Sequence, residues 1–474
     1  MLRLALRFEL RALLRGRAGM VALVAFLAVG ALAIAAGQRH VSQWHEAVTT
    51  ARRAQDESVA EARRLFEQGA AGPPDRPWVD LAQPGWQDRY SSTRVTREPG
   101  PLAGVAAGAV DPAPVAFQVS GSADPLSAGG HRIENPELDA GVVDLAFVLA
   151  VLLPLLIGVL GVEIGGRERQ EGIERLVVVQ AGESRRWLIA RMLAVAAIAA
   201  AACAALCIVA GLVGGASGQE IATLVGSAWV YTAVWSGLML AVNAHAGSIR
   251  DAAFALGTVW TLLCILLPTV AAEVSLSRVE ADFAVTETLG ARTSREAARQ
   301  REPQLVVREL YARYPELERL PAAMEDPLDP KVGRHAADLL LVDEVAARHA
   351  ARREQEQRAQ VVSERAAWLS PVVALELGLE RMAGVGPEAA SEYREYLMQA
   401  VEERAYWVVT KAWTKAPVTQ DDFDALQRAA PAAYLPQRRG GSTPIAALSF
   451  WAVVSWSFAL LALSRAERRR APRR

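Results

Sequence analysis

Six long apolar blocks constrain this chain more than any other feature of its sequence. The blocks are residues 19–37, 142–162, 187–213, 221–244, 252–272 and 445–464. An α-helix needs about 20 apolar residues to cross the roughly 30 Å of hydrocarbon in a bilayer. Hydrophobic residues make up 52% of the chain, and they are gathered in these blocks between charged segments. The sequence therefore predicts an all-α polytopic membrane protein with about six transmembrane helices.

The positions of the arginines predict how these helices are oriented. Basic residues gather in the N-terminal arm (1–18), in residues 163–186 and in the tail (465–474), whereas the short turn 214–220 has none. Cytoplasmic loops carry an excess of Lys and Arg. Even numbers of spans separate the three basic segments, so both termini are predicted to be cytoplasmic. With only three lysines, the composition is typical of a GC-rich bacterial genome. We expect a multi-pass protein of the inner membrane.

The N-terminal arm has the pattern of a helix that lies on a membrane surface. Arg3, Arg7, Arg11 and Arg15 recur at every fourth residue, and Leu and Phe fill most of the remaining positions. A basic amphipathic helix before a span suits the cytoplasmic headgroup layer, with membrane lipids as partners. The alternative is a cleaved signal peptide. However, the apolar run Gly19–Ala36 is longer than the roughly 7–15 residues of a signal-peptide core.

Two large segments are predicted to be extracytoplasmic domains. Residues 38–140 begin with a helix, about 41–68, and continue into Pro/Gly-rich chain with short strands such as Val115–Val119. Residues 273–444 are mainly helical, and Pro303 must kink or restart the first of their helices. The candidate helices are 293–314, 333–368, 371–384, 388–414 and 420–429. Without a strict heptad repeat, a compact helical domain is favoured over a coiled coil.

The segment between the second and third spans is the most informative about function. Residues 163–186 are polar and contain an acidic-glycine pair, Glu171–Gly172, and a break at Gly182. Ser184 can cap the helix that follows, and Arg191 near its start can extend to the interface. We interpret the segment as a short amphipathic helix on the cytoplasmic face, joined directly to a span, that could transmit force. The alternative is a solvated loop whose arginines only set the topology.

This segment resembles the corresponding loop of ABC-2 type permeases. That loop reads acidic–Gly–Thr–x–x–x–Leu, then Pro–x–Ser–Arg, then a span with a basic residue near its start. Here Ile173 replaces the Thr, and Ala181 or Gly182 replaces the Pro. By this resemblance, residues 163–186 are a coupling helix that docks into a cleft on an ATP-binding subunit. The resemblance assigns ATPase coupling to Glu168, Glu171, Gly172, Leu176, Ser184, Arg185 and Arg186.

The layout of the whole chain is similar to the DUF3526 branch of these permeases. Large segments follow the first and fifth spans, and residues 369–375 read Leu-Ser-Pro-Val-Val-Ala-Leu, a motif of that branch. The resemblance implies an exporter permease that works with a second permease copy or a sibling permease. Its ATP is bound by a separate ABC ATPase subunit.

The sequence predicts no catalysis by this chain. A Walker A loop needs Gly-Lys-Ser/Thr, and none of the lysines follows a glycine. The six histidines are scattered, and the three cysteines lie in apolar blocks, so we expect no cofactor and no metal. A net charge of −1 gives no indication of nucleic-acid binding. There are two alternatives. A membrane-anchored signalling or scaffold protein would need a cytoplasmic output domain, which the sequence does not indicate. A membrane-embedded enzyme would need paired acids or histidines in its spans, which the sequence does not indicate either.

Overall fold

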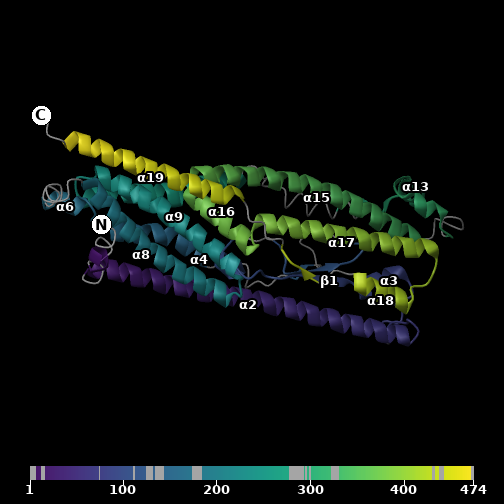
Figure 1. Cartoon of the computed structure of the whole chain (residues 1–474). Helices are drawn as coiled ribbons and strands as arrows, with labels where there is room; N and C mark the ends of the chain where they lie inside the picture. Colours follow the sequence, from purple (N-terminus) through teal and green to yellow (C-terminus); the bar gives the residue numbers. More distant parts are fainter. Residues whose placement is uncertain are drawn as a thin grey trace.

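The protein is elongated, with a bundle of long helices at one end and a lobe of helices and short strands at the other (Figure 1). The structure is a computed structural model. It describes residues 7–11, 16–73, 75–109, 113–123, 132–133, 143–172, 184–276, 293, 296–297, 300–321, 330–429, 433–436 and 442–470.

Six helical segments of the described chain are long and apolar enough to cross a membrane, as predicted. They comprise α2 (Arg17–Glu67), the run α4 (Leu145–Phe147), η3 (Val148–Leu152) and α5 (Leu153–Gly161), α8 (Ser184–Val213), α9 (Gly218–His245), the run α10 (Ile249–Trp260), η4 (Thr261–Leu266) and α11 (Leu267–Leu276), and α19 (Ser442–Arg470). We call them the helical bundle. The start of α2, the end of α19 and α6 (Gly166–Gln170) lie at the same end of the molecule (Figure 1).

Helix α2 continues far beyond the first apolar block. The predicted span 19–37 and the predicted helix 41–68 form one uninterrupted helix of 51 residues. At 1.5 Å per residue such a helix is about 75 Å long, more than twice the hydrocarbon thickness. Gly37 does not break the helix. A Cβ built at Gly37 would lie 2.0 Å from the carbonyl oxygen of Gly104, so only glycine permits this contact.

A proline explains one irregular turn of the bundle. Pro154 has no N–H, so it cannot donate the usual helical bond to the carbonyl of Ala150, four residues earlier. The Tyr231 hydroxyl donates to this carbonyl oxygen at 2.6 Å, and the Trp260 indole N–H donates to the neighbouring Val151 oxygen at 3.1 Å. These bonds stabilise the π-helical segment η3 between α4 and α5. Trp260 therefore has a specific packing role.

The lobe contains a four-stranded sheet in the order β3-β2-β1-β4. Its strands are β1 (Thr93–Arg97), β2 (Ala116–Val119), β3 (Arg132–Ile133) and β4 (Ala433–Tyr434), of which β2 confirms the predicted strand. Strand β1 pairs antiparallel with β2 and parallel with β4. Since β4 belongs to the second large segment (273–444) and β1 to the first (38–140), the sheet joins the two segments.

Four helices of the second large segment begin and end close to the predicted residues, and the predicted helix 293–314 restarts at Pro303 as α13. The helices of this segment are α13 (Pro303–Arg313), η5 (Pro315–Arg319), α15 (Pro330–Leu369), α16 (Pro371–Ala383), α17 (Pro387–Thr414) and α18 (Gln420–Ala429). Helix α13 starts at Pro303, as expected for a residue with a fixed φ and no N–H. The predicted cap of α16 is also present, because the Ser370 hydroxyl accepts the N–H of Val373.

The two large segments, predicted as two extracytoplasmic domains, share one core and pack into one unit. Their shared core includes Val95 and Phe117 of the sheet together with Leu339 of α15 and Leu397 of α17. The Tyr393 hydroxyl of α17 also donates to the Val95 carbonyl at 3.0 Å. We call this unit the polar lobe. It consists of the second half of α2, α3 (Pro84–Tyr90), the sheet, α13, α15, α17 and α18.

Helix α16 belongs with the bundle rather than with the polar lobe. Its apolar residues Val372, Leu375 and Leu379 are fully buried in the same core as the bundle residues Leu149 and Leu240. The Ser370 hydroxyl donates to the Leu263 carbonyl at 3.2 Å. The segment predicted as a purely external helix therefore closes one end of the bundle (Figure 1).

Candidate coupling site at the α6 end of the bundle

Helix α6, which holds part of the predicted coupling segment, lies at the end of the bundle that also holds the start of α2 and the end of α19 (Figure 1). The structure describes Glu168, Glu171, Gly172, Ser184, Arg185 and Arg186 of the predicted coupling residues, and Arg7 and Arg11 of the surface helix. Leu176, Arg3, Arg15 and the predicted break at Gly182 lie outside the described residues.

Two glycines with positive φ set the limits of α6. Gly165 precedes the helix at φ +83°, and Gly172 follows it at φ +74°. The left-handed region is sterically costly for residues with a Cβ. The Glu168 carboxylate accepts the Gly165 N–H at 2.6 Å, so a side chain of the helix caps its own start. The result is a short helix of five residues held between two tight turns.

A buried cluster of charges ties the inner side of α6 to α8. The Arg191 guanidinium of α8 forms ion pairs with Glu168 and with Glu9 of the N-terminal arm. Arg191 is 6% exposed, and its guanidinium carbon lies 5.1 Å from the ring centroid of Phe8 and 5.6 Å from that of Trp187. We expected Arg191 to extend to the interface. It is instead buried, because two carboxylates and two aromatic faces compensate its charge.

Two further contacts hold α6 against α9 and α10. The Arg169 guanidinium donates to the Asn243 carbonyl at 2.6 Å and to the Ala246 carbonyl, both at the end of α9. Arginine at a helix C-terminus satisfies carbonyls that have no helical donor. A Cβ built at Gly166 would lie 3.1 Å from the Ile249 nitrogen at the start of α10. The short helix is therefore in contact with three bundle helices.

The outer side of α6 carries an exposed row of charges. Arg167 lies between Glu163 and Glu171, with nitrogen to oxygen distances of 2.9 Å to each. All three side chains are about half exposed, so these pairs contribute little to stability. Gly172 is also exposed, and a Cβ built on it meets nothing within 4 Å. The predicted site thus divides, with Glu168 facing inward and Glu171 and Gly172 facing outward.

The remaining predicted residues lie at the start of α8 and in the N-terminal arm. Arg186 is exposed and Arg185 is half-buried, and both have interaction partners within the protein. Arg7 and Arg11 are exposed on a helical stretch, residues 7–11. Sequence reasoning missed Glu9. Its signal was present, because Glu9 is the only acidic residue among the arginines of the first 18 residues.

Across the described residues, no cluster of three or more His, Cys, Asp or Glu side chains could hold a metal ion. The described part of the site is therefore built from ion pairs and helix ends. Its chemistry suits mechanical attachment and surface recognition.

Comparison with known proteins identifies one domain in this chain. Residues 278–429 match a family model described as a domain of unknown function, DUF3526. The matched range includes α13, α15, α16, α17 and α18, and it excludes α6 and the six apolar helices. No curated protein and no solved structure matches the chain.

Proposed function

We propose that this chain is the membrane-spanning permease subunit of an ATP-binding cassette exporter in a bacterial inner membrane. A separate ABC ATPase subunit would bind and hydrolyse the ATP, and a second copy or a sibling permease would complete the pathway. The observation that carries the proposal is the two-sided character of α6. Its outer side is exposed at the end of the bundle, and its inner side is attached to α8, α9 and α10.

This arrangement suits the transmission of force from a partner to the bundle. A push on the exposed Glu171–Gly172 turn reaches α8 through the buried pair between Glu168 and Arg191. It reaches α9 through the bonds of Arg169. Packed helices move as rigid bodies between discrete arrangements. Because these contacts join α6 directly to α8 and α9, the short helix can pass a displacement on to both of them.

The placement of the charged segments supports the predicted orientation. The start of α2, α6 and the end of α19 lie at one end of the bundle, and the polar lobe lies at the other (Figure 1). With the basic end in the cytoplasm, the polar lobe faces the extracytoplasmic side. A reporter fused after Gly130 or after Leu340 should then report an extracytoplasmic position. One fused within residues 170–183 should report a cytoplasmic position, and the reversed pattern would contradict the orientation.

A pull-down tests the partnership with an ATPase. The tagged protein is purified from native membranes in mild detergent, and an ATP-binding subunit is expected to co-purify. Glu171→Lys and Gly172→Pro should each abolish the recovery, because both change the outer side of α6 without touching the Glu168 pair. Glu403→Lys is the matched control. It makes the same charge change on an exposed residue of α17, and recovery should be unchanged.

The experiment also separates this proposal from the signalling or scaffold alternative. If no ATP-binding subunit co-purifies in several detergents, the permease proposal is wrong, and the polar lobe becomes the place to look for a ligand or partner. If the ATPase is recovered equally with both α6 variants, the chain is a permease but α6 is not its coupling element.

A further inference from the structure

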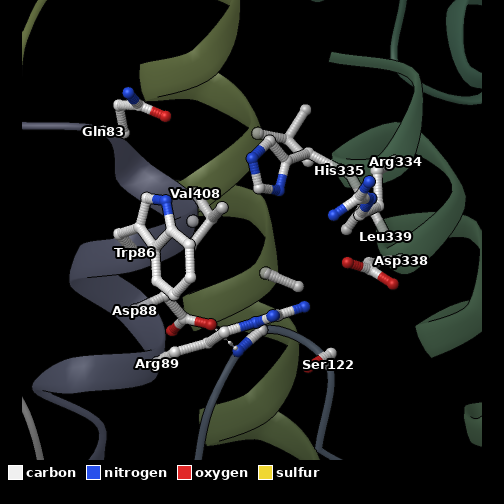
Figure 2. A pocket seen from close by; sticks show the side chains of 14 residues that line it. Gln83, Trp86, Asp88, Arg89, Ser122, Arg334, His335, Asp338, Leu339 and Val408 are labelled. Atoms are coloured by element: carbon white, nitrogen blue, oxygen red, sulfur yellow. Dashed lines mark hydrogen bonds between the residues drawn. The ribbon is translucent and has the colours of Figure 1, made fainter. Parts of the chain in front are cut away.

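The polar lobe contains a cavity of about 260 Å³ between α3, α15 and α17 (Figure 2). Helix α3 contributes Trp86 and Arg89, and α15 contributes Arg334, His335 and Asp338. Ligand sites for small molecules are typically cavities of roughly 300–1,000 Å³. The volume therefore suits a compact molecule, smaller than most cofactors.

Two arginines border this cavity, and neither is ion-paired to another described residue. They are Arg89 on α3 and Arg334 on α15, and both are exposed. They come from helices that are far apart in the sequence. The fold thus brings two uncompensated guanidinium groups to the same cavity, where a carboxylate is the natural complement.

The acidic groups at the cavity are already engaged. The Asp88 carboxylate accepts the Arg404 guanidinium at 2.7 Å and the Gly121 N–H at 2.9 Å. Arg404 and Asp88 are 4% and 5% exposed, so the charge of Asp88, which lines the cavity, is compensated by a buried partner. Asp338 also has an interaction partner within the protein. The charge left for a ligand is therefore positive.

His335 lines the same cavity and lies against the backbone of α3. A Cβ built at Gly85 would lie 2.4 Å from Cε1 of the imidazole, so glycine at this position gives the ring its space. In Figure 2 the imidazole of His335 faces the indole of Trp86 across the opening. Leu339 and Val408 extend the lining, so one part of the cavity is apolar and aromatic.

We propose that this cavity binds a small organic acid. Its carboxylate is held by Arg89 and Arg334, and its compact apolar or aromatic body packs against Trp86. The site is independent of the α6 region and does not rest on the proposed transport function. It would give the polar lobe a ligand of its own.

The protonation of His335 should depend on this ligand. Burial lowers the pKa of His335. Asp88 on α3 opposes the shift, and Arg334 on α15 and Arg89 on α3 add to it. Asp338 of α15 also lines the cavity, and the Asp88 carboxylate is paired with Arg404 of α17. A bound carboxylate favours the protonated ring, so binding takes up a proton. Affinity should then rise as the pH falls from about 8 to about 5.5.

Calorimetric titration of the purified full chain in detergent tests the proposal, with benzoate as the probe. Benzoate is expected to bind. Benzamide, which lacks the charge, and inorganic phosphate, which lacks the apolar body, are expected to bind at least about tenfold more weakly. Arg89→Gln and Arg334→Gln should each weaken benzoate binding about tenfold. Arg308→Gln, on the exposed side of α13, is the matched control and should leave binding unchanged.

Several outcomes would overturn the assignment. Absence of benzoate binding at about 10 mM would exclude a small-acid site. If the Arg89→Gln/Arg334→Gln double variant binds benzoate as tightly as the natural protein, this cavity is not the binding site. Thermal unfolding would verify that the variant is folded. Phosphate binding as strong as benzoate binding would exclude an organic acid as the preferred ligand. His335→Gln should remove the pH dependence, and its persistence would exclude His335 as the group that takes up the proton.

Discussion

Glu376 offers a direct test of how α16 is placed against the bundle. It lies on α16, outside the six apolar helices. Burial raises the pKa of its carboxyl from 4.5 to about 7, and the nearby Asp144 carboxylate adds to this shift. Asp144 is held in place at the start of α4, because its carboxylate accepts the Phe147 N–H at 2.9 Å and the Gly108 N–H at 2.8 Å.

The size of this shift sets the expected change in stability. A shift of one pKa unit corresponds to about 1.4 kcal/mol, so the change from 4.5 to about 7 corresponds to about 3 kcal/mol. The folded-state pKa is raised, so the folded protein binds the proton more tightly than the unfolded chain. The corresponding stability is fully present below about pH 4.5 and is lost as the pH rises through about 7.

Glu376→Gln keeps a neutral side chain of the same size at every pH. The variant should unfold at the same temperature as the natural protein near pH 4.5 and at a higher temperature at about pH 8.5. The advantage at high pH should approach about 3 kcal/mol. Asp144→Asn should lower the pKa of Glu376 and reduce part of the same pH dependence, because it removes the neighbouring charge.

Thermal unfolding in detergent over this pH range measures the effect. Glu403→Gln is the control, because Glu403 is exposed on α17 and its removal should shift the curves little at any pH. A stabilisation by Glu376→Gln that is the same at every pH would refute the reasoning. A stabilisation that is larger at low pH would refute it as well, because the sign of the linkage would then be reversed.

Three further substitutions test other parts of the structure, each by thermal or denaturant unfolding of the purified chain. Arg404→Met should cost about 3–5 kcal/mol, because it leaves the buried Asp88 carboxylate without its ion-pair partner; an effect below 1 kcal/mol would show that the carboxylate is solvated. Gly37→Ala should lower the free energy of unfolding by about 1–3 kcal/mol, because its Cβ would overlap the Gly104 carbonyl oxygen. Gly226→Ala is the control. A Cβ at Gly226 meets nothing within 4 Å, so this substitution should be neutral or stabilising. Ser370→Ala should cost about 1–2 kcal/mol through the lost cap of α16 and the lost bond to Leu263, and Ser370→Thr should retain much of both.

The local elements of this protein could be predicted from its sequence to within a few residues. The six apolar blocks are helices, α13 begins at Pro303, and α16 begins after the Ser370 cap. These features depend on short-range physics, namely the length of apolar runs, the fixed φ of proline and the capping of free N–H groups. Such signals are present in a few adjacent residues, and sequence reasoning can use them directly.

The long-range contacts could not be predicted in the same way. Nothing in the local pattern indicates that β4 pairs with β1, more than 300 residues earlier, or that the two large segments share a core. Helix α16 has an amphipathic pattern that fits a soluble domain equally well. It is buried in the bundle because the fold brings it against α9 and α19, and its apolar side is covered there.

In the candidate site, too, the location could be predicted from the sequence, whereas the contacts between its residues could not. The polar sequence pointed to residues 163–186, and the resemblance to ABC-2 type permeases put Glu168, Glu171 and Gly172 in one set. It did not separate the inward Glu168 from the outward Glu171, and it missed Glu9, because the Arg191 cluster combines three segments of the chain. The length of apolar runs and the placement of charges are properties of the linear sequence, so they can be predicted from it. The pairing of buried charges depends on which segments meet in space, so it is a property of the folded protein.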